Sequence, residues 1–301
     1  KTKSAFLSLG KQPLILELPE LNIVRAPTDN DGLKITTLPQ EQKWKVLYKW
    51  EKEKGIYSFR RTKQTVSSKK DSTLITSVWQ GDLLKDRITL AETVIAGKDG
   101  VFRFENRFEI GKGLDDLPRI GVLLKLPTEF ENVSWFGRGP QENYCDRKAG
   151  YPVGFYESTV DEMHVPYIMP QENGQRTDVR FAALSNGKGQ GLLITAPEEM
   201  EFSVSRYSAE TLYKTMHEHE LEADGCIYLK LDFFQRGLGT ASCGPDTLEK
   251  YKSKSGSYLF RFNLYPFETI PANLSEAAKW LDPALSLEAG EEVSKTIIKE
   301  K

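Results

Sequence analysis

The chain has few cysteines, no long apolar run and almost no net charge, and each shortage excludes a class of protein. Three cysteines, an odd number without a CxxC pair or a metal-ligand spacing, argue against a disulfide framework. No apolar run approaches the roughly 20 residues that a membrane-spanning helix needs. A net charge of −2 provides no basic surface for nucleic acid and no polycationic face for a membrane. The composition therefore predicts a soluble protein of the cytoplasm or the periplasm, and it does not choose between those compartments.

The chain also lacks the features that divide a protein into parts. Its 301 residues contain no Pro/Ser/Gly tract, no charge run and no repeat of fixed period. Hydrophobic residues make up 39% and charged residues 28%, which is ordinary for a globular protein. We therefore expect one large domain over residues 1–301. Because the first residue is Lys1 rather than Met and no signal peptide is recognisable, we also expect the chain to be a piece of a longer protein.

What the sequence does have is the period-two alternation of β-strands. In residues 102–110, apolar residues alternate with arginine and glutamate, which predicts a strand with one buried and one wet face. The same pattern returns at residues 227–233 and 258–264. Further strands are expected at residues 56–66, 73–79, 87–94, 191–195 and 202–207.

Helix signals are scarce. Ser208 can cap a short helix that runs to about Thr215, and residues 276–281 can form another turn or two before Asp282 and its proline. Many antiparallel strands without alternating long helices predict an all-β fold, a large antiparallel β-sandwich. Residues 285–298 are a candidate for a last strand.

Two loops combine Gly/Pro turns with a high density of amides, carboxylates and guanidinium groups. Residues 137–147 read Gly-Arg-Gly-Pro-Gln-Glu-Asn-Tyr-Cys-Asp-Arg, and residues 163–176 read Met-His-Val-Pro-Tyr-Ile-Met-Pro-Gln-Glu-Asn-Gly-Gln-Arg. Ordinary loops use mainly Gly, Pro, Asn and Asp. The added Gln, Glu, Tyr and Arg indicate either a polar network that satisfies buried backbone groups or a polar ligand surface.

These two motifs belong to a longer series: Arg-Ala-Pro-Thr-Asp-Asn-Asp at 25–31, Leu-Pro-Arg-Ile-Gly at 117–121 and Gly-Leu-Gly at 237–239. Together they resemble the C-terminal, or small-chain, domain of glycoside hydrolase family two β-galactosidases. The resemblance extends from about residue 15 to about residue 267, with the motifs in the family's order. It implies a galactose-mutarotase-like supersandwich and, for the parent protein, retaining hydrolysis of terminal β-D-galactosides.

The resemblance also implies what lies elsewhere in the parent protein. The two catalytic glutamates of these enzymes sit on a separate (β/α)8 barrel, and this sequence shows no strand–helix alternation to build one. We therefore predict no catalytic residue in this chain. Family enzymes often use Mg²⁺ and Na⁺ in other domains, so no cofactor is predicted here either. The implied partners are the other domains of the parent, a galactoside at the active-site rim and, if the parent is a homo-oligomer, further copies of it.

The motif residues are expected to be buried and hydrogen-bonded to backbone or to one another. Residues 25–31 have an alternative, because their four oxygen-bearing side chains could hold a calcium ion. Asp and Asn also close turns on their own backbone, however, and an arginine can bind a carboxylate with both arms, which favours the structural role. The predicted structural residues are Arg25, Asp29, Asn30, Glu142, Asn143, Tyr144, Glu172, Asn173 and Arg176.

The loop at residues 237–246 consists mostly of small residues, so its backbone can approach a ligand or another domain closely. In the resembling family this loop reaches the active site, and a tryptophan just before the Gly-Pro or Ser-Pro step stacks on the sugar. The corresponding position here is Cys243, which offers no aromatic surface. We name Ser242, Cys243, Gly244 and Pro245 as candidate rim residues, and we expect little galactose binding by this domain alone.

The three histidines allow two interpretations. In a strand, His217 and His219 would point to the same face, a spacing compatible with one metal ion if a third ligand lay nearby. The favoured alternative is a hydrogen-bonded pair beside the short helix that follows Ser208. His164 is similarly interpreted as a residue that braces its loop. No metal site is predicted.

Two other functions remain open. A free-standing carbohydrate-binding module would stack sugars on exposed aromatics of one concave face, for which Trp44, Trp50, Trp79 and Trp135 are available. Trp135 precedes the 137–147 motif and is expected in the core. The implied fold also hosts mutarotases, and an epimerase of that kind would need a glutamate base and a histidine acid facing a pocket.

Overall fold

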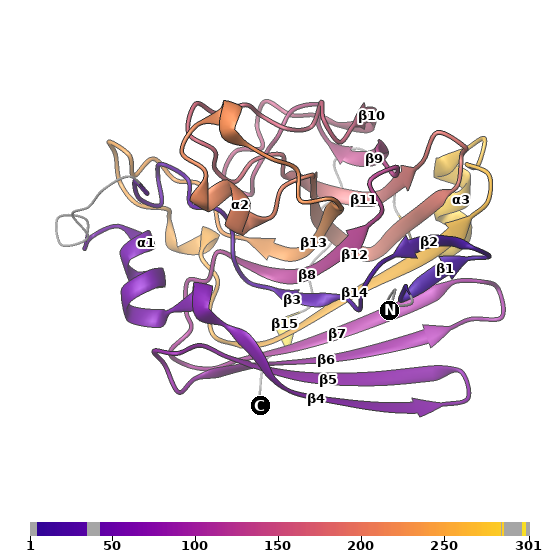
Figure 1. The fold of residues 1–301 in the computed structure, drawn as a ribbon, viewed down its shortest axis with the longest axis horizontal. Helices are drawn as coiled ribbons and strands as arrows, with labels where there is room; N and C mark the ends of the chain where they lie inside the picture. The colour runs from indigo at the N-terminus through magenta and orange to yellow at the C-terminus, as the bar shows by residue number, and fades with distance from the viewer. Residues whose placement is uncertain (1–4, 35–42, 284, 286–296, 299–301) are drawn as a thin grey trace.

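The computed structural model describes residues 5–34, 43–283, 285 and 297–298, and nearly all of their regular structure is antiparallel β (Figure 1). Within these residues thirteen strands form one sheet, whose main path runs β10–β9–β11–β12–β14–β7–β6–β5–β4, while β1 and β2 form a separate hairpin. The strands are β1 Leu7–Leu9, β2 Gln12–Ile15, β3 Glu20–Asn22, β4 Arg60–Lys69, β5 Ser72–Gln80, β6 Arg87–Ala96, β7 Phe102–Ile110, β8 Arg119–Leu126, β9 Asn132–Arg138, β10 Val153–Thr159, β11 Arg176–Ser185, β12 Gly191–Ser205, β13 Ile227–Gln235, β14 Gly256–Phe267 and β15 Ile297–Ile298.

The sheet forks at its longest strand, β12. The first part of β12 pairs with β14, where Thr195 lies opposite Asn263. The last part pairs with β13, where Ser205 lies opposite Tyr228, and β13 leads on to β8 and β3. β11 pairs along the other edge of both parts. The sheet therefore continues from β12 as two layers, β14–β7–β6–β5–β4 and β13–β8–β3.

The main hydrophobic core joins these two layers. Leu124 of β8 and Leu229 of β13 belong to the same buried cluster as Phe108 of β7 and Phe260 of β14. Burying a side chain of this size stabilises the fold by roughly 1.5–3 kcal/mol, so the alternating apolar residues are sufficient reason for the layers to pack. The predicted all-β fold, a large antiparallel β-sandwich, is confirmed.

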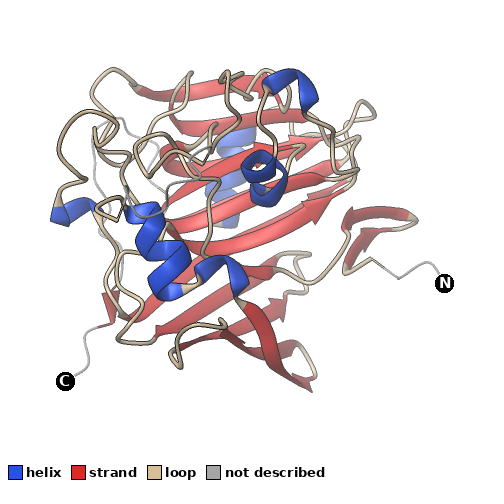
Figure 2. Ribbon diagram, turned by 60° about the vertical axis from the view of Figure 1, so that its left-hand side comes forward, coloured by secondary structure: helices blue, strands red, loops and turns tan. Residues whose placement is uncertain are grey.

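Helical segments and long loops lie mainly on one side of the sheet. In Figure 1, α2 and the long loops lie near β8, β12 and β13, whereas β4 to β7 are joined by short turns. Figure 2 shows most helical segments in front of the strands. None of the helices in the described part of the chain is long and apolar enough to cross a membrane. The helical segments are α1 Val46–Tyr48, which continues as a π-helical turn at Lys49–Lys54, 3-10 turns at Ile56–Ser58, Glu218–Glu220 and Glu249–Tyr251, α2 Ala209–Lys214 and α3 Leu274–Leu281.

Most predicted strands are present, and one prediction is wrong in part. The strand expected from residue 56 begins only at Arg60, because Gly55 adopts a left-handed conformation (φ 62°) and a 3-10 turn follows it. The strands expected at 191–195 and 202–207 are a single strand, β12. The helix after Ser208 is α2, and the Oγ atom of Ser208 accepts the N–H of Thr211 at 3.0 Å as its cap.

The C-terminal segment adds one helix and one short strand. α3 begins two residues before the expected start, and Asn273 caps it by accepting the N–H of Glu276 at 3.2 Å. β15 pairs with β14, with Ile298 opposite Ser257. Residues 286–296 of the expected last strand lie outside the described residues.

Candidate functional site

A buried cluster of charges lies between the loops and β8 and β13. Glu172, from the 163–176 motif, accepts hydrogen bonds from Arg119 at 2.6 Å and Lys230 at 2.9 Å, and all three side chains are buried. It also accepts the N–H of Ala26 at 3.2 Å, and its own N–H donates to the Ala26 carbonyl. Burial acts to raise the pKa of Glu172, but Arg119 and Lys230 outweigh it and lower the pKa to about 2. The carboxylate therefore ties the 25–31 motif to the sheet in its charged form.

Asp232 of β13 has a different environment in the same cluster. It pairs with Arg119 at 3.6 Å, while both of its carboxylate oxygens are buried without a hydrogen-bond partner among the described residues. Burial raises the pKa of Asp232 to about 7, and the charge of Arg119 only partly offsets this. The pKa values of two carboxyl groups in one cluster are thus shifted in opposite directions, down for Glu172 and up for Asp232.

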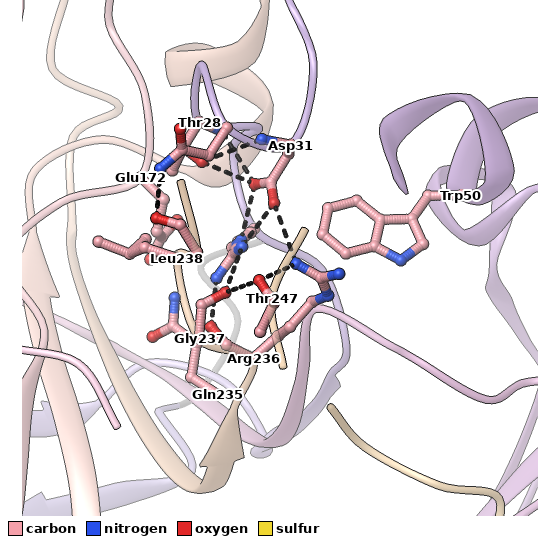
Figure 3. A network of polar contacts seen from close by, with 12 residues as sticks. Thr28, Asp31, Trp50, Glu172, Gln235, Arg236, Gly237, Leu238 and Thr247 are labelled. Atoms are coloured by element: carbon pink, nitrogen blue, oxygen red, sulfur yellow. Dashed lines mark hydrogen bonds and ion pairs between the residues drawn. The ribbon is translucent and has the colours of Figure 1, made fainter. Parts of the chain in front are cut away.

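Arg25 and Asp31 form a buried ion pair, and Figure 3 shows Asp31 within the polar network around it. The guanidinium binds the carboxylate with two nitrogens, at 2.9 and 2.6 Å, and both side chains are fully buried. Its third nitrogen donates to the carbonyl of Arg236 at 2.6 Å, and Asp31 also accepts the N–H of Thr28 at 3.0 Å. Trp50 packs beside the guanidinium groups of Arg25 and Arg236. Its ring centroid lies 5.6 Å from the guanidinium carbon of Arg25 and 5.8 Å from that of Arg236. The Asp31 oxygens are therefore engaged by protein donors, which supports the structural interpretation of residues 25–31 over a calcium site.

The 137–147 and 163–176 motifs hold each other through their side chains. Glu142 accepts the hydroxyl of Tyr167 at 2.5 Å and the N–H of Gly174 at 2.9 Å. Asn143 accepts both the N–H and the hydroxyl of Thr177, at 2.9 and 2.6 Å. These bonds satisfy the buried backbone N–H groups of Gly174 and Thr177, as the polar-network interpretation requires.

Seven of the nine predicted structural residues are buried, and two are not. Asn30 is half-buried, and Asp29 is exposed, contrary to the expectation, although its backbone N–H donates to Gln171. Asp29 lies at the tip of the turn that Thr28 and Asp31 close, so its side chain points away from the base of the turn. The seven buried residues are Arg25, Glu142, Asn143, Tyr144, Glu172, Asn173 and Arg176.

The 237–246 loop has a rigid base and an exposed tip. Asp146 accepts the N–H groups of Leu238 at 3.0 Å and Gly239 at 2.7 Å. Asn30 donates to the Gly239 carbonyl at 2.9 Å and accepts the N–H of Ser242 at 2.9 Å. Lys45 donates to the carbonyl of Ala241. The tip is wholly exposed, and it consists of the four candidate rim residues Ser242, Cys243, Gly244 and Pro245.

The histidines are engaged in local contacts. His217 caps the 3-10 turn that contains His219, so the two do not alternate along a strand; their rings stack with centroids 5.6 Å apart. His164 lies 2.8 Å from a carboxylate oxygen of Glu218, as expected of a residue that braces its loop. Among the described residues, no group of three His, Cys, Asp or Glu side chains is placed to hold a metal ion.

A model of the family described as "Beta galactosidase small chain" matches residues 2–264. The chain belongs to the β-galactosidase small-chain family. The β-galactosidase of Vibrio cholerae is 47% identical over 126 residues, or 42% of this small chain and 12% of the relative. That of Actinobacillus pleuropneumoniae is 29% identical over 272 residues, or 90% of this chain and 26% of the relative. The small chain thus spans about an eighth to a quarter of the curated relatives that it matches.

Among solved structures, the GalM/aldose epimerase homologue from C. elegans resembles the small chain with a TM-score of 0.39. The sequences are 11% identical, and the match covers 69% of each chain.

Several residues that build the site of this small chain escaped the sequence analysis. Asp31 stands inside the 25–31 motif, and its position six residues after Arg25, which was expected to be buried, was a usable signal for an ion pair between the two. Asp146 likewise stands inside the 137–147 motif. Two contacts have no such signal, because the bond from Arg25 to the Arg236 carbonyl and the bond from Lys45 to the Ala241 carbonyl each join residues more than 190 positions apart.

Proposed function

We propose that this small chain is the C-terminal domain of a retaining β-galactosidase, in which it packs on the catalytic barrel and lines the rim of the active site. The observation that carries the proposal is the 237–246 loop, whose exposed tip stands on a base fixed by Asp146, Asn30 and Lys45. A loop that must shape a rim needs an accessible tip in a fixed position, since misplaced contacts lose binding energy. The four-residue tip, Ser242 to Pro245, meets both requirements.

The chemistry is assigned to the rest of the parent protein. Retaining glycosidases use two carboxyl groups about 5–5.5 Å apart, one as nucleophile and one as acid/base. Two of the buried carboxylates described above are committed to structural donors, Glu172 to two cations and Glu142 to a hydroxyl and a backbone N–H, and the third, Asp232, pairs with Arg119. The proposal therefore takes residues 1–301 as one domain whose role is to shape the site. Contacts with further copies of the parent are a secondary role.

Substitutions at Cys243 in the full-length protein test the rim role. Cys243→Trp restores an aromatic surface at the tip, and a single aromatic contact contributes roughly 0.5–1.5 kcal/mol. We expect the KM for an aryl galactoside to fall about twofold to tenfold, with a smaller change in kcat, because the loop contacts substrate and not the reacting bond. Leu248→Trp, which adds the same ring at an exposed position outside the tip, is the control. Equal kinetics for wild type, Cys243→Trp and Cys243→Ala would show that the loop does not reach the substrate.

The isolated chain tests where the chemistry resides. We expect residues 1–301 alone to leave a chromogenic β-galactoside uncleaved above background. The assignment is wrong if turnover survives repurification and disappears when one carboxylate of this chain is replaced.

The two alternative functions have weaker support. A carbohydrate-binding module would gather exposed aromatics on one face, but Trp44, Phe155 and Trp280, the large exposed aromatics of the described residues, lie near α1, on β10 and on α3. Figure 1 shows α1 and α3 at opposite ends of the molecule. An epimerase would need a histidine facing a pocket, whereas His164 is held by Glu218 and packs edge-on against Tyr207.

A further inference from the structure

Trp44 is an exposed aromatic residue beside the rim loop. It lies just before α1, and 61% of its surface is exposed, whereas Trp50 and Trp135 are fully buried. The ammonium group of Lys45 lies 4.3 Å from the centroid of the Trp44 ring. The same ammonium group donates a hydrogen bond to the carbonyl of Ala241, directly before the exposed tip. One cation therefore joins the indole ring to the base of the tip.

This junction holds the indole in a defined place. Lys45 is buried, and burial lowers its pKa, while the charges of Asp31 and Asp246 act in the opposite direction. A partly desolvated ammonium over an indole face is worth roughly 0.5–2 kcal/mol, enough to favour one orientation of the ring. Because the ammonium covers one face, the exposed surface must include the other face. The ring is thus an anchored aromatic surface that is open to solvent on one side.

We infer that Trp44 supplies the aromatic surface that Cys243 cannot, and that the aglycone of a β-galactoside stacks on its open face. This inference rests on the proposed function. The ligand class is a galactoside with a cyclic aglycone, either a second sugar or an aryl group, because both present a flat apolar face that an indole can cover. A methyl aglycone has no such face. Trp44 and Cys243 are 199 positions apart in the sequence, so only the fold shows that Trp44 lies close enough to take the place of an aromatic residue at position 243.

The test uses the full-length enzyme with Trp44→Ala and three substrates: lactose, nitrophenyl β-galactoside and methyl β-galactoside. We expect the KM for lactose and for the nitrophenyl galactoside to rise about threefold to tenfold, with kcat within about twofold of wild type. The KM for the methyl galactoside should stay within about twofold. Trp44→Phe, which keeps a smaller ring, should restore most of the loss. Thermal unfolding should be unchanged, since an exposed ring contributes little to the core.

Trp280→Ala is the matched control, because Trp280 is 58% exposed and lies on α3, at the other end of the molecule from α1. Its kinetics should equal those of wild type with all three substrates. The inference is overturned if Trp44→Ala leaves every KM unchanged, if it raises the KM of the methyl galactoside equally, or if it lowers the unfolding temperature or dissociates the parent. A wild-type parent that hydrolyses no β-galactoside would instead refute the proposed function, so the two failures are distinguishable.

Discussion

β7 and β11 are strands of one sheet and nearly equal in length, yet they use charge in opposite ways. In β7, phenylalanines face the core while Arg107 and Glu109 point into water. In β11, all ten residues are buried, including Arg176, Asp178 and Arg180. The difference arises outside the strands: α3 and the loops cover β11, where Phe181 and Ala183 pack against the helix, whereas the second face of β7 is open. Polarity on a strand therefore indicates a wet face only where nothing folds over it.

The same difference determines what an ion pair contributes. Arg107 and Glu105 pair at 3.1 Å in the solvent, where such a pair is worth about 0–1 kcal/mol. Glu172 pairs with Arg119 and Lys230 where no side chain is solvated, so removing one partner leaves a buried charge alone. The loop-covered side should consequently be intolerant of changes that the open side accepts.

The largest effect is expected from Glu172→Gln, which removes the carboxylate that Arg119 and Lys230 share. The free energy of unfolding should fall by roughly 3–5 kcal/mol, measured by urea denaturation at pH 7. Glu105→Gln is the same substitution on the open face of β7 and should cost less than about 0.5 kcal/mol. Similar costs for the two variants would mean that the loops do not exclude water from the cluster.

The next effect is a pH dependence from Asp232, whose pKa is raised to about 7. Below about pH 4 the carboxyl group is protonated in both the folded and the unfolded state. Between about pH 4 and 7 the unfolded chain releases this proton while the folded chain keeps it, so the stability that the group contributes is lost as the pH rises. The slope is at most about 1.4 kcal/mol per pH unit.

We expect the free energy of unfolding of Asp232→Asn, measured by urea denaturation from pH 4 to 8, to lack this decline. The comparison concerns the slope with pH and does not depend on how the stabilities of the variant and the wild type differ at pH 4. Glu172, with its pKa lowered to about 2, should show the opposite sign: its contribution is present above about pH 4.5 and is lost as the pH falls toward 2. Parallel pH profiles for wild type and Asp232→Asn would contradict the assignment.

A smaller effect is expected for Asn143→Ala, which leaves the buried N–H and hydroxyl of Thr177 without their acceptor. The cost should be about 1–3 kcal/mol in thermal or urea unfolding. Asn132→Ala, at an exposed position of β9, provides the control and should change stability little. If Asn143→Ala were as stable as its control, the motif would have to be reinterpreted as a ligand surface.

The smallest effect should come from β4, the edge strand, in which all ten residues are exposed. Val66→Thr keeps a β-branched side chain and should change the stability by no more than about 0.5 kcal/mol, or roughly 1–2 °C in Tm. A loss of several degrees would show that β4 is covered in solution, which would weaken the contrast between the two sides.

The sequence predicted the strands with visible apolar alternation better than the strand that is buried on both faces, for a physical reason. β7 and β14 were found because one face of each is apolar and the alternation is visible, and β13 was found by the same alternation although its Lys230 and Asp232 are also buried. β11 escaped because both of its faces are buried, so no alternation marks it. The segment before β4 was misassigned, because the buried Ile56 suits a strand as well as the 3-10 turn it occupies.

The candidate site was predictable in part. The burial of Glu142 and Glu172 followed from polar motifs in loops that needed internal partners. The contact of Arg25 with the Arg236 carbonyl, and the position of Trp44 beside Ala241, depend on how loops far apart in sequence meet. No local pattern records such meetings, so the residues that surround the 237–246 loop have to be taken from the fold.

The fork at β12 also bears on how the domain opens. β12 pairs with β14 along residues 191–195 and with β13 along residues 201–205, so each layer is hydrogen-bonded to the strand that also holds the other layer. Amide protons of β12 should therefore exchange with solvent only when the whole domain unfolds, whereas those of the β4–β5 hairpin should exchange through local opening. A strand shared by two layers makes their unfolding one event, so the 237–246 loop, which follows β13, keeps its position for as long as the other layer is intact.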